Sequence, residues 1–258
     1  MQYGGLLRPV EAHALLQPML YLKQVEVRPS SHGASSGGAL LWSVRVSLRL
    51  SKACLGLDRL LTSVGFDFAE LQTERPVTGL QEDWLEQVPG ARTWSPSDPQ
   101  LHSLTVSLRF GSVELDRVTV RFGLRTVTTS DSRILINGEP VLLLGVNRHE
   151  SHPLGGIYLP HQQLIEDLKI IRELGANFVR GAHYSQDQRF LDLCDEFGVL
   201  VWEETMSWQP SFEDLQDPIF MSQQLQMLDE TIDASVNHPS VIMWGFLNEG
   251  EATSPLVR

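Results

Sequence analysis

The sequence predicts a multidomain β plus α/β protein, with an all-β part first and an α/β part second. Up to about residue 128, apolar and polar residues alternate with a period of two, which is the pattern of strands with one buried face. After residue 128, short apolar runs alternate with helical patterns, which indicates parallel strands joined by helices. The length of 258 residues is enough for two domains.

The first part reads as a series of antiparallel strands. Between residues 41 and 50 the apolar positions are Trp42, Val44, Val46, Leu48 and Leu50, with polar residues between them. Strand-like runs cover residues 21–27, 41–50, 101–110 and 113–122, and turn-rich segments cover residues 30–38 and 96–99. This pattern predicts a β-sandwich of about 100 residues.

The second part reads as four strands and three helices. A continuous apolar run at Val141–Val146 predicts a strand covered on both faces. The first helix has apolar residues at 164, 168, 171 and 174 and ends at Gly175, the second ends at Gly198, and the third starts at Pro218 with Asp217 as its cap. The other strands are predicted at residues 177–180, 199–202 and 241–247.

Polar residues follow each predicted parallel strand. They are Asn147 to Glu150, Arg180 with His183, Glu203 with Glu204, and Asn248 with Glu249. An open doubly wound sheet and half of a closed barrel both fit the element count, and both carry active sites at the carboxyl ends of their strands. The segment 145–156 contains no G-x-G-x-x-G turn, which argues against dinucleotide binding.

Glu249 is the main catalytic candidate, because a carboxyl at a pocket wall can serve as a general acid. Its neighbour Asn248 can offer an amide to a substrate hydroxyl. The alternative is that Asn248 and Glu249 only cap a following helix. Arg180 can pair with Glu203 or Glu204 and still orient a carboxylate within a site.

The histidines at 149, 152 and 183 raise the question of a metal. His149-Glu150-Ser151-His152 is not H-E-x-x-H and follows a strand, and no cysteines support a zinc site, so we expect no metal and no cofactor. Trp202, Trp208 and Trp244 either stack on a sugar or fill the core, with core favoured for Trp244. The absence of a G-x-S-x-G motif argues against a serine hydrolase.

Composition limits the partners. The formal net charge is −12 and there is no run of Lys or Arg, so we expect no nucleic-acid or membrane partner. The start of the chain has no signal-peptide pattern, and the two cysteines are isolated, which predicts a soluble protein in a reducing, cytoplasmic compartment.

Several motifs resemble glycoside hydrolase family 2, which holds β-galactosidases and β-glucuronidases. They are Asn137 to Val141, Gly145 to Pro153, Asn177 to Tyr184, and Asn237-His-Pro-Ser240 through Trp244 to Glu249. Trp94-Ser95-Pro96 and, earlier, Tyr3-Gly4-Gly5 with Arg8-Pro9 are similar to the domains that precede the family's barrel. The resemblance implies three regions: residues 1–18 as the tail of a missing sugar-binding jelly roll, 19–127 as an immunoglobulin-like β-sandwich, and 128–258 as the first half of a TIM (β/α)8 barrel.

The resemblance also implies residue roles. Glu249 is implied as the general acid/base, and Asn248 as the partner of the sugar 2-hydroxyl. His149, His183, Arg180 and Glu204 are grouped as substrate-binding residues of a carbohydrate site. The segment after Glu204 lacks the Glu-x-His that supplies magnesium ligands in some β-galactosidases, so no metal is carried over.

A retaining glycosidase needs two carboxyls about 5–5.5 Å apart, and the family's nucleophile comes from a late barrel strand. The sequence ends nine residues after Glu249. We therefore expect a chain of the β-galactoside or β-glucuronide class that holds the acid/base but is inactive alone. Its uncovered edge strands predict a complementary chain or a homo-oligomer. A non-catalytic carbohydrate-binding module or a non-functional gene fragment is the alternative.

Overall fold

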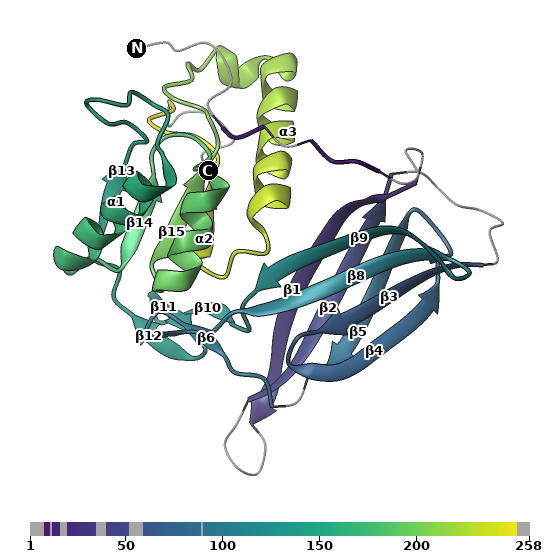
Figure 1. Cartoon of the computed structure of the whole chain (residues 1–258). Coiled ribbons are helices and arrows are strands. Elements are labelled where there is room, and N and C mark those ends of the chain that lie inside the picture. Colours follow the sequence, from purple (N-terminus) through teal and green to yellow (C-terminus); the bar gives the residue numbers. More distant parts are fainter. Residues whose placement is uncertain are drawn as a thin grey trace. The chain divides into compact units, whose positions relative to one another are not determined.

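The computed structural model describes residues 8–10, 12–15, 20–34, 40–51, 59–88 and 90–251 (Figure 1). The chain forms two compact units. One contains residues 11–141, and the other contains residues 1–10 and 142–258. We call them the sandwich unit and the barrel unit, and describe each by itself.

The sandwich unit consists of antiparallel sheets (Figure 1). One sheet has the order β1-β2-β5, formed by β1 (Leu22–Ala34), β2 (Leu40–Leu50) and β5 (Gln81–Gln87). The other has the order β4-β3-β8-β9, formed by β3 (Leu60–Phe66), β4 (Ala69–Pro76), β8 (His102–Phe110) and β9 (Val113–Phe122). Smaller strands follow: β6 (Trp94–Ser95), β7 (Asp98–Pro99), β10 (Val127–Ser130), β11 (Arg133–Ile136) and β12 (Glu139–Val141).

The core of this unit follows the alternation in the sequence. The five apolar residues predicted to face inward from β2 are at most 2% exposed, and they share one core with Val64, Leu104 and Val106 of the other sheet. Burial of these side chains is the main driving force for pairing the sheets. The antiparallel sandwich predicted from the sequence is confirmed.

The sandwich unit differs from the expectation in the turn-rich segment 30–38 and in strands β3, β4 and β5, none of which the sequence predicted. The turn-rich segment 30–38 begins as strand, because β1 continues to Ala34 and pairs Ser30 with Ser43 and Ser31 with Trp42. A long partner strand overrides the weak strand preference of serine. Strand β3 was not expected, because buried Thr62 and Ser63 interrupt its alternation.

The barrel unit contains a parallel sheet with the order β13-β14-β15-β16 (Figure 1). Its strands are β13 (Gly145–Arg148), β14 (Phe178–Gly181), β15 (Leu200–Glu204) and β16 (Val241–Gly245). The connecting helices are α1 (His161–Glu173), α2 (Gln188–Phe197), the short η1 (Asp214–Gln216) and α3 (Pro218–Ser235). Leu164 and Leu168 of α1, Phe190 of α2, and Val179 and Val201 of the sheet share one core. The predicted parallel strand–helix alternation is therefore present.

The helix ends also agree with the sequence signals. The Asp217 carboxylate accepts a hydrogen bond of 2.8 Å from the Ile219 amide at the start of α3. Gly198 ends α2 in the left-handed conformation, with a φ of 70°. A side chain with a Cβ is strained in that conformation, and glycine is not.

The strand predicted at Val141–Val146 is wrong. β12 ends at Val141 and β13 starts at Gly145, and between them Leu142 and Leu144 are 74% and 54% exposed. The reason lies in Asn177. Its side chain accepts from the Leu144 amide and donates to the Leu142 carbonyl, both at 2.9 Å, and so binds backbone groups that a strand would use for pairing.

Strands β10 to β12 belong to the sandwich unit, which ends at residue 141. The expected domain limits, residues 19–127 and 128–258, stay a prediction. Among the residues that the model describes, no helix combines the length and the apolarity needed to cross a bilayer.

Candidate active site

Side chains from three neighbouring strand ends meet at the carboxyl edge of the parallel sheet. Arg180, from β14, donates from Nε to Glu204 Oε1 at 2.6 Å and from Nη2 to Asn248 Oδ1 at 2.7 Å. His183 Nδ1 lies 3.0 Å from the other Glu204 oxygen. Glu204 is almost completely buried. Of the two carboxylates that sequence offered as partners for Arg180, the structure selects Glu204.

These contacts determine which atoms remain available to a ligand. Because Arg180 engages the amide oxygen of Asn248, the Nδ2 group is left to donate to a substrate oxygen. Because a carboxylate only accepts, His183 holds its proton on Nδ1 toward Glu204, and Nε2 is left for other contacts. The cluster therefore offers an oriented amide and an oriented imidazole.

His149 lies beside this cluster, with its ring 5.3 Å from the ring of His183. Partial burial lowers the pKa of His149, and the electrostatic effects of His183 and Arg180 lower it further, against the opposing effect of Glu204. A lowered pKa keeps the imidazole neutral at neutral pH, so His149 can accept or donate a hydrogen bond without adding charge.

Glu249 follows Asn248 directly, and its side chain is exposed. Its carboxylate accepts a hydrogen bond of 2.8 Å from Gln209 Nε2. The loops after β15 and β16 are also joined by backbone hydrogen bonds from Gln209 to Asn248 at 2.8 Å and from Asn248 to Ser207 at 2.7 Å. The Asn248–Glu249 pair is thus part of a loop–loop pairing and follows a strand rather than capping a described helix.

Gln209 was not expected near Glu249. It lies 40 residues earlier, in a loop with no sequence signal for contact with the carboxylate. Both residues have left-handed backbone conformations, with φ of 52° for Gln209 and 51° for Glu249, which is uncommon for residues with a Cβ. Such conformations cluster at functional sites, but they cannot be read from the sequence of a single chain.

Gly245 lets strands β15 and β16 approach each other closely beside the cluster. A Cβ at this position would lie 2.2 Å from Trp202 Nε1 and 2.9 Å from Glu204 Cγ. Both distances are shorter than van der Waals contact, so any larger residue would displace Trp202 or the carboxylate that Arg180 binds. Trp202 also lies against the Arg180 guanidinium, 5.7 Å from ring to Cζ.

Glu150 does not join the cluster. Its buried carboxylate contacts Arg148 Nη1 at 3.3 Å, accepts from the Asp187 amide at 2.7 Å and forms an ion pair with Arg8. Trp244 is half-buried, packs against the core and donates to Ser235 Oγ, as the core alternative predicted. His152 lies in the exposed turn before α1, where its Nδ1 accepts from the Leu154 amide at 3.2 Å.

Glu203 is the other carboxylate at the end of β15. It is fully buried and accepts a hydrogen bond of 2.9 Å from the Gln186 amide. Burial raises the pKa of Glu203 from about 4.5 to about 8, partly offset by the hydrogen bond from Gln186 and the charge of His238. The folded protein therefore keeps a proton on Glu203 that the unfolded chain releases at neutral pH.

This difference predicts a pH-dependent stability. Below pH 4.5 Glu203 is protonated in both the folded and the unfolded protein, and its contribution to the free energy of unfolding is fully present. As pH rises toward 8 the unfolded state loses the proton first, so the free energy of unfolding falls by up to about 1.4 kcal/mol per pH unit. We expect Glu203→Gln to flatten this fall and to be more stable than the parent at pH 8. Urea unfolding at pH 5, 6.5 and 8 measures the free energy of unfolding of both proteins. Equal pH profiles for the parent and Glu203→Gln would contradict the prediction.

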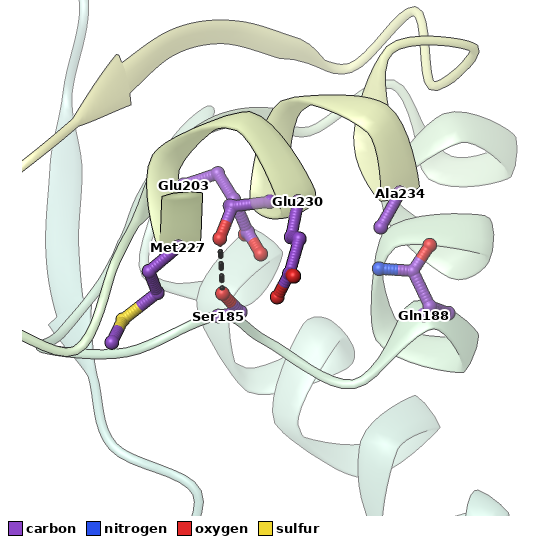
Figure 2. A pocket seen from close by; sticks show the side chains of 7 residues that line it. Ser185, Gln188, Glu203, Met227, Glu230 and Ala234 are labelled. Atoms are coloured by element: carbon purple, nitrogen blue, oxygen red, sulfur yellow. Dashed lines mark hydrogen bonds between the residues drawn. The ribbon is translucent and has the colours of Figure 1, made fainter. Parts of the chain in front are cut away.

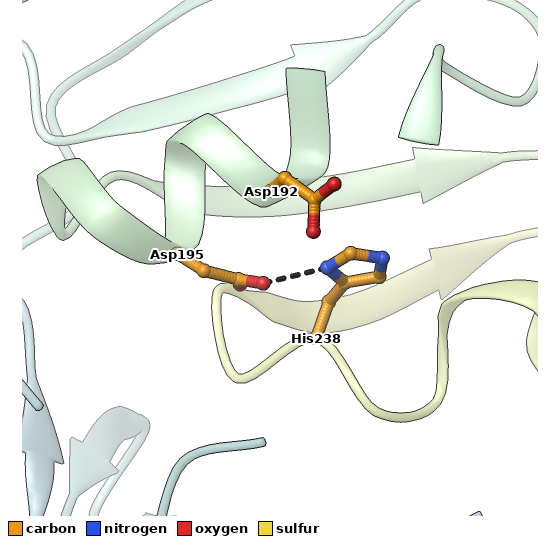
Figure 3. Close-up of side chains that lie close together, drawn as sticks. All are labelled: Asp192, Asp195 and His238. Atoms are coloured by element: carbon orange, nitrogen blue, oxygen red, sulfur yellow. Dashed lines mark hydrogen bonds and ion pairs between the residues drawn. The ribbon is translucent and has the colours of Figure 1, made fainter. Parts of the chain in front are cut away.

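The Asn237-His-Pro-Ser240 motif is held by Asp195 of α2. Asp195 Oδ1 accepts from the Ser240 amide at 3.0 Å and from the Ser240 hydroxyl at 2.6 Å, and Oδ2 lies 2.6 Å from His238 Nδ1 (Figure 3). Burial opposes protonation of His238, but the hydrogen bond that His238 donates to Asp195, together with the negative charges of Asp195 and Asp192, raises the pKa of His238. The motif thus has a structural role at the start of β16.

Asp192, Asp195 and His238 also place three potential ligand atoms within 4.8 Å of one another. Both oxygens of Asp195 already have protein partners, and those hydrogen bonds account for the grouping. We assign it no metal.

The parallel strands lie side by side in the order in which they follow along the chain, β13-β14-β15-β16, without the reversal of a doubly wound sheet, and this puts the barrel unit in the β/α-barrel class of proteins. The family model described as glycosyl hydrolases family 2, TIM barrel domain, matches residues 127–256, and a second family 2 model matches residues 58–125. The chain belongs to the family 2 glycosyl hydrolases.

Similar proteins agree with this assignment. A β-galactosidase from Thermoanaerobacter pseudethanolicus is 38% identical over 170 residues, which are 64% of this chain and 22% of that protein. A β-glucuronidase from Chlorocebus aethiops is 33% identical over 181 residues, which are 67% of this chain and 28% of that protein. The chain therefore spans less than a third of the length of these curated relatives.

Among solved structures, a family 2 β-galacturonidase from Eisenbergiella tayi, bound to galacturonate, is 34% identical with a TM-score of 0.76. The match covers 92% of this chain and 42% of that chain. The expected fold, an immunoglobulin-like sandwich followed by part of a TIM barrel, is confirmed by the family matches and by the two units described above.

Proposed function

We propose that this chain carries the acid/base half of a retaining β-glycosidase site. The observation that carries the proposal is the cluster of Arg180, Glu204 and Asn248, whose last member directly precedes Glu249 in the sequence. In this proposal Glu249 protonates the leaving glycosidic oxygen and then deprotonates the attacking water. These are the two tasks of an acid/base residue in retaining enzymes.

The neighbouring residues would bind the sugar. Asn248 donates its free Nδ2 to the 2-hydroxyl, a contact that strengthens in the transition state. Arg180 keeps the Asn248 amide in the required orientation through its 2.7 Å hydrogen bond. His183 is held by Glu204, and with the neutral His149 it offers imidazole groups to further hydroxyls. We propose no metal and no cofactor for this site.

The proposed substrate is a terminal β-galactoside or β-glucuronide. Two observations support that class: the curated relatives include a β-galactosidase and a β-glucuronidase, and the Eisenbergiella tayi protein was solved with galacturonate. All three sugars have the pyranose shape that an amide, an imidazole and a carboxyl can surround. A panel of chromogenic β-galactosides, β-glucuronides and β-galacturonides would distinguish them.

The second carboxylate of the mechanism is not supplied by the described cluster. Glu204 is occupied by Arg180 and His183, and Glu150 is occupied by Arg148 and the Asp187 amide. Withdrawing Glu204 would remove the carboxylate that Arg180 binds, and withdrawing Glu150 would remove one carboxylate partner of the buried Arg148, both of which are unfavourable. We therefore propose that the nucleophile lies outside the described residues.

This gives a direct expectation for the purified 258-residue chain. It is expected to release no chromophore above the uncatalysed rate from any substrate of the panel. Turnover that is abolished by Glu249→Gln would contradict the expectation of inactivity while supporting the role of Glu249. Sugar binding that is unchanged by substitution of both Glu249 and His183 would favour a non-catalytic binding module instead.

The proposed partner is a complementary chain or a second copy. Strands β13 and β16 end the described parallel sheet, and uncovered edge strands favour pairing. We also propose a cytoplasmic location, because a free thiol is typical of a reducing compartment. Cys194 is a buried free thiol, and Cys54 lies outside the described residues. Light scattering tests the association, and a monodisperse monomer would contradict it.

A further inference from the structure

A pocket of about 230 Å³ lies in the helical layer of the barrel unit, behind the parallel sheet. It is bounded by β15, by the segment that leads into α2, and by α3 (Figure 2). Adjacent residues of a strand point to opposite faces, so Glu204 faces the candidate active site and Glu203 faces this pocket. The pocket is therefore separate from the candidate active site.

The lining of the pocket combines acidic and apolar side chains. Glu203 and Glu230 contribute carboxyl groups, and no lysine, arginine or histidine is among the lining residues. Figure 2 shows both side chains extending toward the space beside Ser185. Met227 and Ala234, which lie on either side of Glu230 along α3, add apolar side chains.

Glu203 has a polar atom without a protein partner. Its Oε1 accepts from the Gln186 amide, but its buried Oε2 has no hydrogen-bond partner among the described residues. A fully buried carboxyl oxygen without a partner is unfavourable and calls for an explanation, such as a bound ligand. The hydroxyls of Ser185 and Thr231, 3.0 Å apart, lie on the same lining and can accept further hydrogen bonds.

We propose that this pocket binds a small organic ammonium ion. The ammonium group would donate to Glu203 Oε2, to the Glu230 carboxylate and to the Ser185 hydroxyl, and the short alkyl part would lie against Met227. An ammonium group has three donors and no acceptor, which matches a lining of carboxyl and hydroxyl oxygens.

The lining favours an organic cation over a bare metal ion. Calcium needs six to eight oxygen ligands at short range, and magnesium needs near-ideal octahedral geometry. Here only two carboxyls line the pocket, and Met227 and Ala234 add apolar side chains that offer no ligand oxygen. A volume of about 230 Å³ also exceeds what a single ion requires and leaves room for several carbon atoms.

Binding is linked to a proton. Burial raises the pKa of Glu203 to about 8, so near neutrality the empty pocket holds the protonated acid. The charges around it are those of His238 before β16, Glu150 after β13, and Arg8, with Glu230 facing it from α3. When the ammonium ion binds, Glu203 loses its proton to solvent, and the ion pair replaces the O–H bond. Apparent affinity should therefore rise by about tenfold per pH unit until pH 8.

The test uses n-propylammonium as the probe and the full 258-residue chain. Isothermal titration calorimetry at pH 6, 7 and 8, in buffers of different ionisation enthalpy, measures both affinity and protons released. We expect millimolar binding at pH 8, release of about one proton at pH 7, and binding weakened by at least about tenfold in Glu203→Gln. Glu173→Gln, an exposed carboxyl on α1, is the matched control and should bind as the parent does.

The variant remains interpretable because Glu203→Gln is expected to stay folded and to gain stability at pH 8. Three results would overturn the proposal: no binding up to about 50 mM propylammonium at pH 8, equal binding by Glu203→Gln, or equal binding of neutral 1-propanol. Stronger binding of potassium than of propylammonium would also overturn it, in favour of an inorganic cation site.

Discussion

Glu249→Gln is expected to lower kcat/KM by about 10²- to 10⁴-fold in a completed barrel, because the amide cannot give a proton to the leaving oxygen. The measurement requires the rest of the barrel. We would fuse residues 1–251 of this chain to the part of the Eisenbergiella tayi β-galacturonidase that follows its matching region, and assay nitrophenyl glycosides.

The leaving group provides an internal check. A dinitrophenyl leaving group departs with little protonation, so the loss on Glu249→Gln should be much smaller with that substrate if Glu249 is the acid. Glu251→Gln is the matched control. Glu251 lies two residues away and accepts a 2.9 Å hydrogen bond from the Phe212 amide, which a glutamine oxygen also accepts. An equal loss in both variants, or a loss in neither, would contradict the assignment.

Arg148→Met is expected to lower the free energy of unfolding of the barrel unit by about 3–5 kcal/mol. The Arg148 side chain is 5% exposed, donates to Asp167 at 2.9 Å and to Gln186 at 2.8 Å, and contacts Glu150. Its guanidinium also lies 3.8 Å from the ring centre of Phe190. Removing it leaves the buried Gln186 amide oxygen without this donor, takes a partner from Asp167 and removes the cation beside the buried Glu150.

Urea unfolding followed by circular dichroism at 222 nm measures this loss. The described helices all belong to the barrel unit, so the helical signal reports that unit. Lys169→Met is the matched control, because Lys169 and Glu166 form an exposed pair on α1, and exposed ion pairs contribute little to stability. A change below about 1 kcal/mol in Arg148→Met would contradict the network's importance.

The sequence predicted the fold well wherever side-chain periodicity reflects burial. The alternation along β2 and the cap at Asp217 both correspond to observed contacts. It failed where a side chain at a distance decides the backbone, as Asn177 does for Leu142 and Leu144. Such long-range capping leaves no local pattern.

The candidate site was predictable to a similar degree. The strand-end rule identified Arg180, His183, Glu204 and Asn248, which meet in the structure. Gln209 could not be identified, because its contact with Glu249 depends on how two loops pair. That Glu203 and Glu204 face opposite sides of the sheet follows from strand alternation. The difference in their surroundings depends on how the sheet packs against α2 and α3.

The hydrogen bonds between Ser240 and the Asp195 carboxylate affect the position of strand β16 as well as local stability. The segment 240–248 contains strand β16. It is held at its start by the hydrogen bonds from Ser240 to the Asp195 carboxylate of α2, and at its end by the hydrogen bond from Arg180 to Asn248. Because both ends of the strand are held by hydrogen bonds, a mutation that breaks the bonds at either end is expected to shift the whole strand. We therefore expect a substitution at Asp195 to displace Glu249, the proposed acid/base, at the opposite end of the strand without contacting it.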